Sequence, residues 1–293
     1  GPYCSMILAD HGARVIAVED KRFADDPFCV SAVNRNKEHI TINLKSEGGL
    51  EVFRSLVQKA DVLIEGFRPG VAARLGIDST SMREVNPGLV YCSITGYGQF
   101  GPDTYKAGHD VNYIGAAGLL DLMGHAGAPP VIPGTQIADL AGGMNAVMGI
   151  LLALMAREQS GQGQYVDISM SDAALGLMPF VLNQYNQTGC KPQRGDLLLA
   201  HRYACYNTYE TADGRALSVG ALEPKFWSAL CTRLGLEEYI AHQFDDSRRE
   251  EIVSEFQRII GRKTLGQWEE ELRDLDACCD GVRTVDEALE HPH

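Results

Sequence analysis

Residues 39–64 read HITINLKSEGGLEVFRSLVQKADVLI, and this stretch decides the fold that we expect. Its first part, 39–44, contains alternating β-branched and polar residues, which predicts a strand. Ser46 is a plausible N-cap for a helix whose apolar residues recur at helical spacing, namely Leu50, Phe53, Leu56 and Val57. Residues 61–64 are a short apolar run typical of a buried strand. A strand, a helix and a second strand in this order predict parallel strands.

The same alternation continues on both sides of this stretch. Before it, a helix over 4–11 ends near Gly12 and precedes a strand over 14–18. After it come a short helix over 71–75, a strand over 89–95, a long helix over 137–158, a strand over 164–168 and a helical pattern over 170–187. This order predicts an α/β fold with a doubly wound parallel sheet. Ligands of such sheets bind at the carboxyl ends of the strands, so we expect one shared rim for Lys45, Phe67, Arg68 and the glycine loop 96–102.

The pattern changes near residue 190. Two strands over 205–211 and 216–219 flank a turn at Asp213 and Gly214, and helical patterns follow over 224–236, 248–261 and 264–273. We therefore expect two domains, a large one over 1–195 and a small α+β one with its linker over 196–293. Neither end of the sequence resembles a natural terminus, so we expect that flanking N- and C-terminal segments are missing.

The composition excludes some classes of protein. The net charge of −13, without any basic run, argues against a nucleic-acid partner. No apolar run reaches about 18 residues without polar interruption, so we expect no membrane span. The eight cysteines are scattered, without a CxxC pair or metal-ligand spacing. This usage predicts reduced thiols in a cytoplasmic protein and no metal site.

Residues 108–143 contain a candidate acid/base pair. His109 lies in the sequence GHDVNY, and Asp139 lies about thirty residues later, in IADLAGG, where the long helix begins. Each residue also has an ordinary explanation, because Asp139 could be a helix cap and Asp110 could orient the His109 ring or simply end a loop. The glycines that follow Asp139 would let a ligand approach the helix end closely.

A second group of residues could bind an anion. Lys45, Arg68 and Arg74 could hold phosphates by charge-assisted hydrogen bonds, and Phe67 offers a stacking face, although all four could be ordinary surface or core residues. Glu223 precedes Pro224, so helix capping explains it equally well. The sequence has no dinucleotide fingerprint, no Walker motif and no nucleophile elbow. The residues alone therefore predict an α/β protein with an anion-binding rim and a possible acid/base pair.

Across nearly its whole length the chain resembles the type III coenzyme A transferases, a CaiB/BaiF-like family that also contains the α-methylacyl-CoA racemases. Its most family-like stretches are residues 1–4, 34–45, 60–76, 96–102, 108–113, 138–143, 161–167 and 220–227. The resemblance implies a Rossmann-like large domain, a small domain and a homodimer of interlocked chains, with the active site between the large domain of one chain and the small domain of the other. It also implies an acyl-CoA substrate, with coenzyme A as part of the substrate and no prosthetic group.

The resemblance also assigns roles to residues. GHDVNY followed by ADLAGG is similar to the racemase pattern, in which His109 and Asp139 move the α-proton on opposite faces of a thioester enolate. Glu223 would hydrogen-bond the histidine, and backbone N–H groups at the Asp139 helix end would stabilise the enolate oxygen. Lys45, Phe67, Arg68 and Arg74 would contact coenzyme A.

Two alternatives to racemisation stay open at this point. The first is CoA transfer between carboxylic acids, with Asp139 as the nucleophile that forms a mixed anhydride and His109 as a bystander. The second is a catalytically silent CoA-binding scaffold. The chain departs from its relatives at His201, Arg202 and Tyr203, where small glycine-rich residues are common. A cation there could meet a substrate carboxylate, or the segment could be a changed surface loop.

Overall fold

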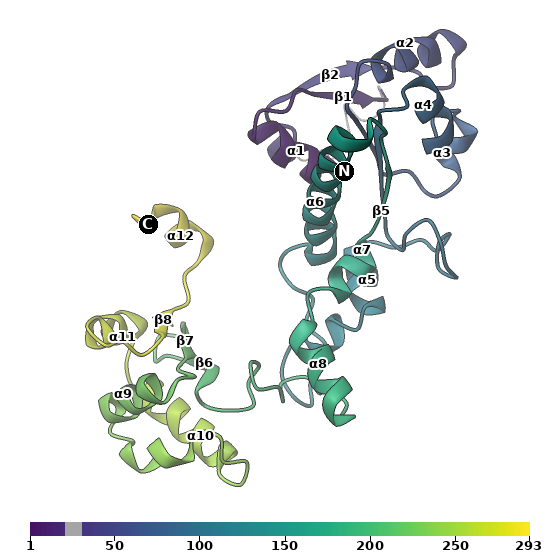
Figure 1. Ribbon diagram of the computed structural model, residues 1–293. Helices are drawn as coiled ribbons and strands as arrows, with labels where there is room; N and C mark the ends of the chain where they lie inside the picture. The colour runs from purple at the N-terminus through teal and green to yellow at the C-terminus, as the bar shows by residue number, and fades with distance from the viewer. Residues whose placement is uncertain (21–30) are drawn as a thin grey trace. The chain divides into compact units, whose positions relative to one another are not determined.

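The computed structural model describes residues 1–20 and 31–293, which form two compact units (Figure 1). The first, here called the large unit, comprises Gly1–Asp121 and Ile132–Gln187. The second, the small unit, comprises Leu122–Val131 and Thr188–His293. The ten residues Leu122–Val131 thus belong to the small unit although the chain on both sides of them belongs to the large unit. The sequence pattern did not indicate this.

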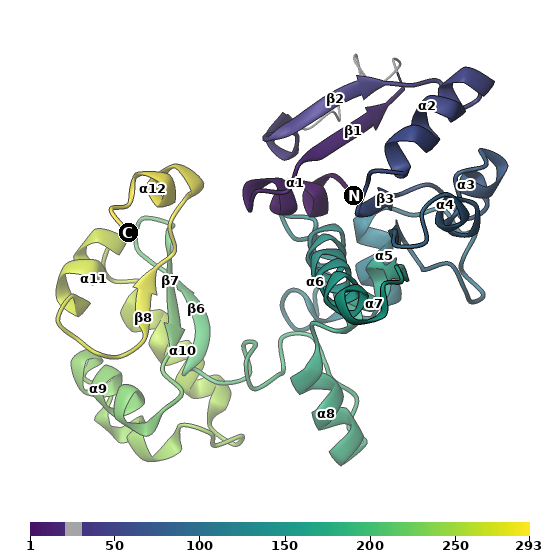
Figure 2. The ribbon, with the colours of Figure 1, turned by 45° about the horizontal axis from the view of Figure 1, so that its top comes forward.

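The large unit contains parallel strands, as the sequence predicts. Strands β3 (Val62–Glu65), β4 (Val90–Thr95) and β5 (Tyr165–Ser169) form one parallel sheet in that order. Strands β1 (Val15–Glu19) and β2 (Lys37–Thr41) form a separate parallel pair (Figure 2). The expected single sheet is therefore two sheets in the described part of the chain, because no ladder joins them.

Helices cover both faces of the three-stranded sheet. Helices α1 (Pro2–Asp10) and α6 (Ile137–Ser160) pack on one face, against Val90, Cys92 and Ile94. Helices α2 (Glu47–Val57) and α4 (Ser79–Val85) pack on the other face, around Leu63 and Tyr91. The predicted cap of α2 is confirmed, since the Ser46 side chain accepts a hydrogen bond from the backbone of Gly49 at 3.2 Å. A short helix, α3 (Val71–Arg74), follows β3.

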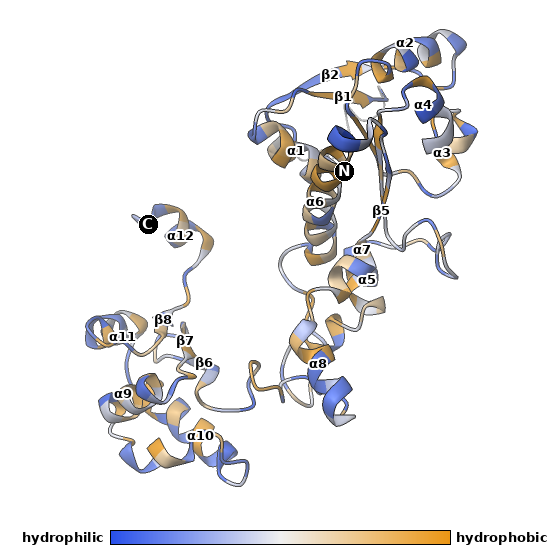
Figure 3. Cartoon of the chain, in the orientation of Figure 1, coloured by the Kyte–Doolittle hydropathy of each residue, from blue (hydrophilic) through white to orange (hydrophobic). Residues whose placement is uncertain are grey.

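Helix α6 is the central helix of the large unit. It is the one helix of the described residues whose length and apolarity would suffice to cross a membrane, with a mean hydropathy of 1.7 (Figure 3). Its side chains Ala146, Ile150 and Ala153 are buried against the sheet, which is the packing of a core helix. From the sequence we expected that the glycines after Asp139 would let a ligand approach this helix end. The structure shows instead that other side chains fill the space beside them. A Cβ on Gly142 would lie 2.8 Å from Met170, and one on Gly143 would lie 2.9 Å from Tyr3.

The remaining elements of the large unit are short. Helix α5 (Asp110–Ala116) precedes α6, and the 3-10 turns η2 (Ser31–Val33) and η3 (Leu120–Leu122) connect longer elements. The helix predicted over 170–187 is two helices, α7 (Met170–Leu175) and α8 (Pro179–Thr188). The break falls just before Pro179, because proline has no N–H to donate and disfavours helical backbone in the residue before it.

The small unit is α+β, as expected. Strands β6 (Tyr206–Glu210), β7 (Ala216–Gly220) and β8 (Cys279–Gly281) form an antiparallel sheet. It carries the helices α9 (Pro224–Leu234), α10 (Arg249–Ile260), α11 (Leu265–Leu272) and α12 (Val285–Glu290), and the 3-10 turn η4 (Glu237–His242). Its core centres on Trp227, whose ring stacks on that of Phe256 at 5.1 Å between centroids.

Candidate active site

A cavity of about 310 Å³ lies at the carboxyl ends of β3 and β4. This is the end of a parallel sheet where ligands bind. Its lining residues are Gly66, Phe67, Arg68, Pro69, Val71, Arg74, Ile94, Thr95, Gly96, Tyr97, Thr104, Tyr105, Lys106, Ala107, Gly108, Tyr113 and Met170. We call it the rim cavity. The structure thus brings together three of the four predicted coenzyme residues, Phe67, Arg68 and Arg74, whereas Lys45 is not among the lining residues.

Three cations line the rim cavity, because Lys106 joins Arg68 and Arg74. The Lys106 ammonium lies 3.8 Å from a carboxylate oxygen of Asp103 and 5.5 Å from the centre of the Tyr97 ring. Sequence reasoning missed Lys106, although it lies only two residues before the GHDVNY motif. Three positive side chains around one concave site favour a ligand with several negative charges.

The wall of the rim cavity depends on two glycines and one tyrosine. A Cβ on Gly96 would lie 2.2 Å from the Tyr113 ring, and one on Gly108 would lie 2.7 Å from it, so both positions must lack a side chain. The Tyr113 hydroxyl donates to the carbonyl oxygen of Gly108. In the same wall, the hydroxyl of Thr95 is buried and has no hydrogen-bond partner among the residues that the structure describes.

Asp110 joins the start of α5 to the start of α6. Its Oδ1 accepts hydrogen bonds from the backbone N–H of Ala138 at 2.7 Å and of Asp139 at 3.1 Å. This capping role differs from both explanations that the sequence left open for Asp110. It also corrects the expectation that these N–H groups are available to an enolate oxygen, because the carboxylate already occupies two of them. Asp139 itself is in the first turn of α6, and the N-cap position belongs to Gln136.

The carboxyl of Asp139 is electrostatically coupled to its neighbours. Burial raises its pKa, the charge of Asp110 raises it further, and the charge of His109 lowers it. Asp139 also acts on the rim cavity, since its charge raises the pKa of Tyr113, which burial has already raised and which Arg68 lowers. His109 is exposed at the N-cap position of α5, next to Asp110. The charges of the imidazole and the carboxyl therefore act on each other, although neither His109 nor Asp139 is among the residues that line the rim cavity.

The third predicted catalytic residue, Glu223, is in the small unit. It is exposed at the N-cap position of α9, ahead of Pro224, but its side chain makes no capping hydrogen bond. Helix capping therefore does not explain why a carboxylate is present at this N-cap position. Its charge contributes to the raised pKa of the Cys278 thiol, after burial of that thiol.

Arg202 is already paired in the structure. Its guanidinium lies 3.2 Å from a carboxylate oxygen of Asp196 and 2.9 Å from one of Asp246. The Tyr203 hydroxyl donates to the same Asp246 at 2.9 Å, and Arg249 pairs with Asp196. These contacts fix the segment before β6 within the small unit. Since Arg202 already faces two carboxylates, its role is to hold this segment in place, and the expectation that it meets a substrate carboxylate loses its support.

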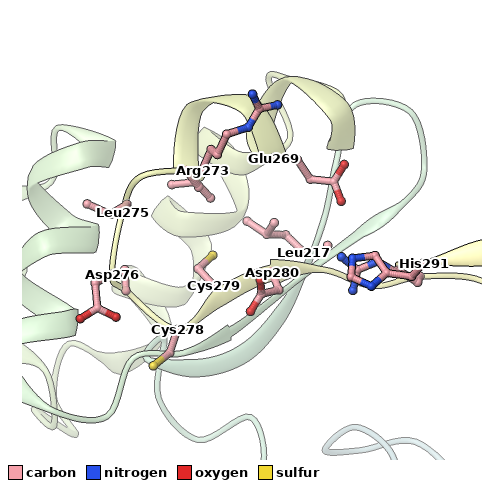
Figure 4. Close-up of a pocket in the computed structure, with 13 residues that line it drawn as sticks. Leu217, Glu269, Arg273, Leu275, Asp276, Cys278, Cys279, Asp280 and His291 are labelled. Carbon is pink, nitrogen blue, oxygen red and sulfur yellow. The ribbon is translucent and has the colours of Figure 1, made fainter. Parts of the chain in front are cut away.

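A second and larger cavity, of about 690 Å³, lies in the small unit between α11 and β8 (Figure 4). It contains none of the sequence-predicted residues. Two of its lining residues are the adjacent cysteines, and burial raises the pKa of both thiols, that of Cys279 to about 12. Such thiols are protonated at neutral pH and are poor nucleophiles. Within the described residues, no cluster of three or more His, Cys, Asp or Glu side chains could hold a metal ion, here or elsewhere. We therefore place the candidate active site at the rim cavity.

Comparisons with known proteins give a consistent result. The family model described as CoA-transferase family III matches residues 1–293. The chain is 36% identical over 295 residues to the alpha-methylacyl-CoA racemase of Mus musculus, covering 100% of this chain and 76% of that protein. It is also 36% identical over 251 residues to the acetyl-CoA:oxalate CoA-transferase of Acetobacter aceti, covering 81% and 64% of the two chains. The crystal structure of a CAIB/BAIF family protein from Brucella suis matches with a TM-score of 0.85 at 28% identity, covering 99% of this chain and 82% of that one.

Proposed function

The chain belongs to CoA-transferase family III and is an enzyme that acts on acyl-CoA thioesters, either as a racemase or as a CoA-transferase. From this premise we propose that it racemises 2-methylacyl-CoA thioesters. In this reaction the α-proton leaves one face of the substrate and a proton returns to the other. His109 and Asp139 are the two proton-transferring groups, and in the homodimer proposed below Glu223 of the second copy orients the imidazole. The whole-chain likeness to a protein named as a racemase supports this choice.

The observation that carries the proposal is the hydrogen-bonded bridge through Asp110. His109 is adjacent to Asp110 in the chain, and the Asp110 carboxylate holds the backbone of Asp139 at 3.1 Å. The imidazole and the carboxyl therefore come from the beginnings of two helices that are fixed to each other. Inversion through a planar enolate needs an acid and a base at fixed positions on opposite faces, which a single carboxylate does not supply.

The proposed proton transfers follow from this arrangement. One of the two groups takes the α-proton, the thioester becomes an enolate, and the other group delivers a proton to the opposite face. The raised pKa of Asp139 suits this role, because a carboxylate is a stronger base when its pKa is closer to neutral pH. The positive end of the α6 dipole favours the negative charge of the enolate, although two of the helix's N–H groups are already bonded to Asp110.

The coenzyme part of the substrate is assigned to the rim cavity. Arg68 and Arg74, together with Lys106, bind its phosphates, and Phe67, whose side chain is 38% exposed, offers a stacking face to the adenine. Lys45 is exposed after β2 and outside the cavity lining, so we assign it to a phosphate beyond the cavity.

The second candidate function is CoA transfer between carboxylic acids, with Asp139 as the nucleophile that forms a mixed anhydride. Relatives named as CoA-transferases support it. Against it stands the pairing of Arg202 with Asp196 and Asp246, because this removes the one cation that sequence reasoning had offered to a dicarboxylic acid.

We also propose that the enzyme is a homodimer, with interlocked chains, in the cytoplasm. One face of α6 is apolar and exposed in the described part of the chain, and a second copy would cover it. Its residues are Met144, Met148, Leu151, Leu152 and Met155. The seven described cysteines are all free, which fits a reducing compartment.

Exchange in heavy water tests the reaction. The full-length protein is incubated with one enantiomer of a 2-methylacyl-CoA, without any acceptor acid. We expect deuterium at the α-carbon together with racemisation, and both should fall at least about 100-fold in His109→Ala and in Asp139→Ala. The matched control is His11→Ala, an exposed histidine at the end of α1.

The other outcomes identify the alternatives. CoA movement that depends on an acceptor acid, without deuterium at the α-carbon, would reject racemisation, and so would full activity of His109→Ala. Trapping of Asp139 by hydroxylamine during turnover would favour transfer. Binding of acyl-CoA without either reaction would identify a scaffold.

A further inference from the structure

A row of polar side chains crosses the three-stranded sheet at one level. The strand register pairs Glu65 with Ser93 and Ser93 with Asp167, so the three side chains point to the same face. This face is opposite to the one that α6 covers, since Cys92 and Ile94, the neighbours of Ser93, pack against α6. Glu65 is only 8% exposed and Ser93 only 2%. Sequence reasoning had not selected any of the three.

Glu65 uses both carboxylate oxygens. The Ser93 hydroxyl donates to one of them, and the backbone N–H of Phe67 donates to the other at 2.7 Å. The Tyr165 hydroxyl donates to the Ser93 oxygen at 3.2 Å and so fixes the hydroxyl from the next strand. The bond to Phe67 holds the turn after β3, which carries Phe67 and Arg68 into the lining of the rim cavity.

Asp167 makes the corresponding contact to the glycine loop. Its Oδ2 accepts a hydrogen bond from the backbone N–H of Gln99 at 3.0 Å. Gly98 allows this turn of the loop, because it has a left-handed φ of 79°, which favours glycine. The first residues of this loop, Gly96 and Tyr97, line the rim cavity.

The row is costly to the folded protein. Burial raises the pKa of Glu65 and of Asp167, and the charge of Asp167 raises that of Glu65 further. Ionised groups so placed lose hydration and repel each other, and Oδ1 of Asp167 is buried with no hydrogen-bond partner in the described residues. Apolar side chains would fill the same face of a sheet at lower cost. What the two acids do in this structure is accept backbone N–H groups from the segments that follow β3 and β4.

We propose that Glu65 and Asp167 are positioning residues for coenzyme A, each accepting the backbone N–H of one of the two loops that line the rim cavity. Neither residue touches the ligand. Glu65 sets the place of Phe67 and Arg68, and Asp167 sets the place of the glycine loop, while Ser93, fixed by Tyr165, donates to the Glu65 carboxylate. The inference rests on the proposed binding of coenzyme A at this cavity.

The test measures binding and turnover separately in the full chain. The dissociation constant of acetyl-CoA is measured by calorimetry, and kcat and KM are measured by α-proton exchange. We expect Glu65→Ala to bind acetyl-CoA about tenfold more weakly and to raise KM equally, because one backbone anchor of the cavity is lost, while kcat stays within about threefold of wild type. Glu65→Gln should restore binding to within about threefold, since its amide oxygen still accepts from Phe67.

The second comparison is between Asp167→Ala and Asp167→Asn. We expect the alanine variant to bind acetyl-CoA more weakly because the glycine loop loses its anchor, and the asparagine variant to restore binding. Glu51→Ala, an exposed glutamate on α2, is the control for loss of a negative charge. If Glu65→Ala does not fold, the Asp167 pair alone decides the inference, because Asp167 holds its loop through a separate backbone hydrogen bond.

Unchanged binding in both alanine variants overturns the inference, and so does a fall of kcat at unchanged KM. A wild-type protein that does not bind acetyl-CoA refutes the proposed coenzyme site itself, which is a different outcome from intact wild-type binding and unaffected variants.

Discussion

Removal of the Asp110 carboxylate should weaken both the fold and the chemistry. The carboxylate accepts hydrogen bonds from two backbone N–H groups at the start of α6, at 2.7 and 3.1 Å. Asp110 lies 28 positions before the first of these donors in the chain. Loss of a side-chain cap of this kind costs about 1–2 kcal/mol. A domain of the size of the large unit loses about 2–4 °C in Tm for each kcal/mol, so Asp110→Ala should melt roughly 2–8 °C lower.

Activity should fall by more than stability explains. Without the bridge, the start of α6 is no longer fixed to the residue that follows His109, and a misplacement of about 1 Å costs roughly 100-fold in rate. We therefore expect kcat for α-proton exchange to fall about 10- to 100-fold in Asp110→Ala. The variant Asp110→Asn keeps an acceptor oxygen without the charge and should retain most of kcat.

The pH profile separates position from charge. Burial and then the charge of Asp110 raise the pKa of Asp139, so the proton leaves this carboxyl at a higher pH than from an ordinary aspartate. On the acid side of the pH profile, the rate of α-proton exchange rises as Asp139 loses its proton, and we call this part of the profile the acid limb. Removal of the Asp110 charge should lower the pKa of Asp139 and move the acid limb to lower pH in both variants.

A matched control comes from the cap of α4. The Asp78 carboxylate also accepts two backbone N–H groups, from Thr80 and Ser81. Asp78→Ala should lose comparable stability and leave kcat and the acid limb unchanged. Wild-type kcat together with a wild-type acid limb in Asp110→Ala would refute the role that we give to the bridge.

Three further predictions concern the rim cavity, its wall and the exposed face of α6. Arg68→Ala should raise the KM for acyl-CoA about tenfold with little change in kcat, measured at low and high salt, because a charge-assisted hydrogen bond to a phosphate is lost. Gly96→Ala should lower the melting temperature, since its Cβ would lie 2.2 Å from the Tyr113 ring and overpacking costs about 1–3 kcal/mol, whereas Gly48→Ala, with open space around it, should not. Leu152→Glu should prevent the dimer from forming when the variant chain folds, so that light scattering after gel filtration gives the mass of a monomer, and an unchanged mass would show that this face is not the interface.

Local sequence signals located most of the secondary structure. The apolar spacing in 47–57 and the Ser46 cap predicted α2 correctly, because a helix of this length depends on side chains that are neighbours in the chain. The end of α6 at Gly161 follows from the left-handed backbone there, with a φ of 68°. The break before Pro179 could have been predicted by the same kind of rule. The separate pairing of β1 with β2 could not, since strand neighbours are chosen by long-range contacts.

The candidate site shows a similar division. The residue types at 67, 68 and 74 pointed to an anion, and the structure gathers these side chains at one cavity. Lys106 was missed because nothing in its immediate sequence indicates which cavity it will line. The carboxylates that pair with Arg202 come from Asp196, 6 residues away, and from Asp246, 44 residues away, so its local sequence gave no sign of the second.

By itself, the sequence determined the family, the order of most helices and strands, and the chemical types available for catalysis, because these depend on composition and on short spacings. Only the tertiary structure decided which of those groups are already engaged. Asp110 occupies the N–H groups of Ala138 and Asp139, and Glu65 and Asp167 hold the loops of the rim cavity. Most of these hydrogen bonds join residues that are far apart in the chain, and all of them form only when it folds, so no local pattern of residues predicts them.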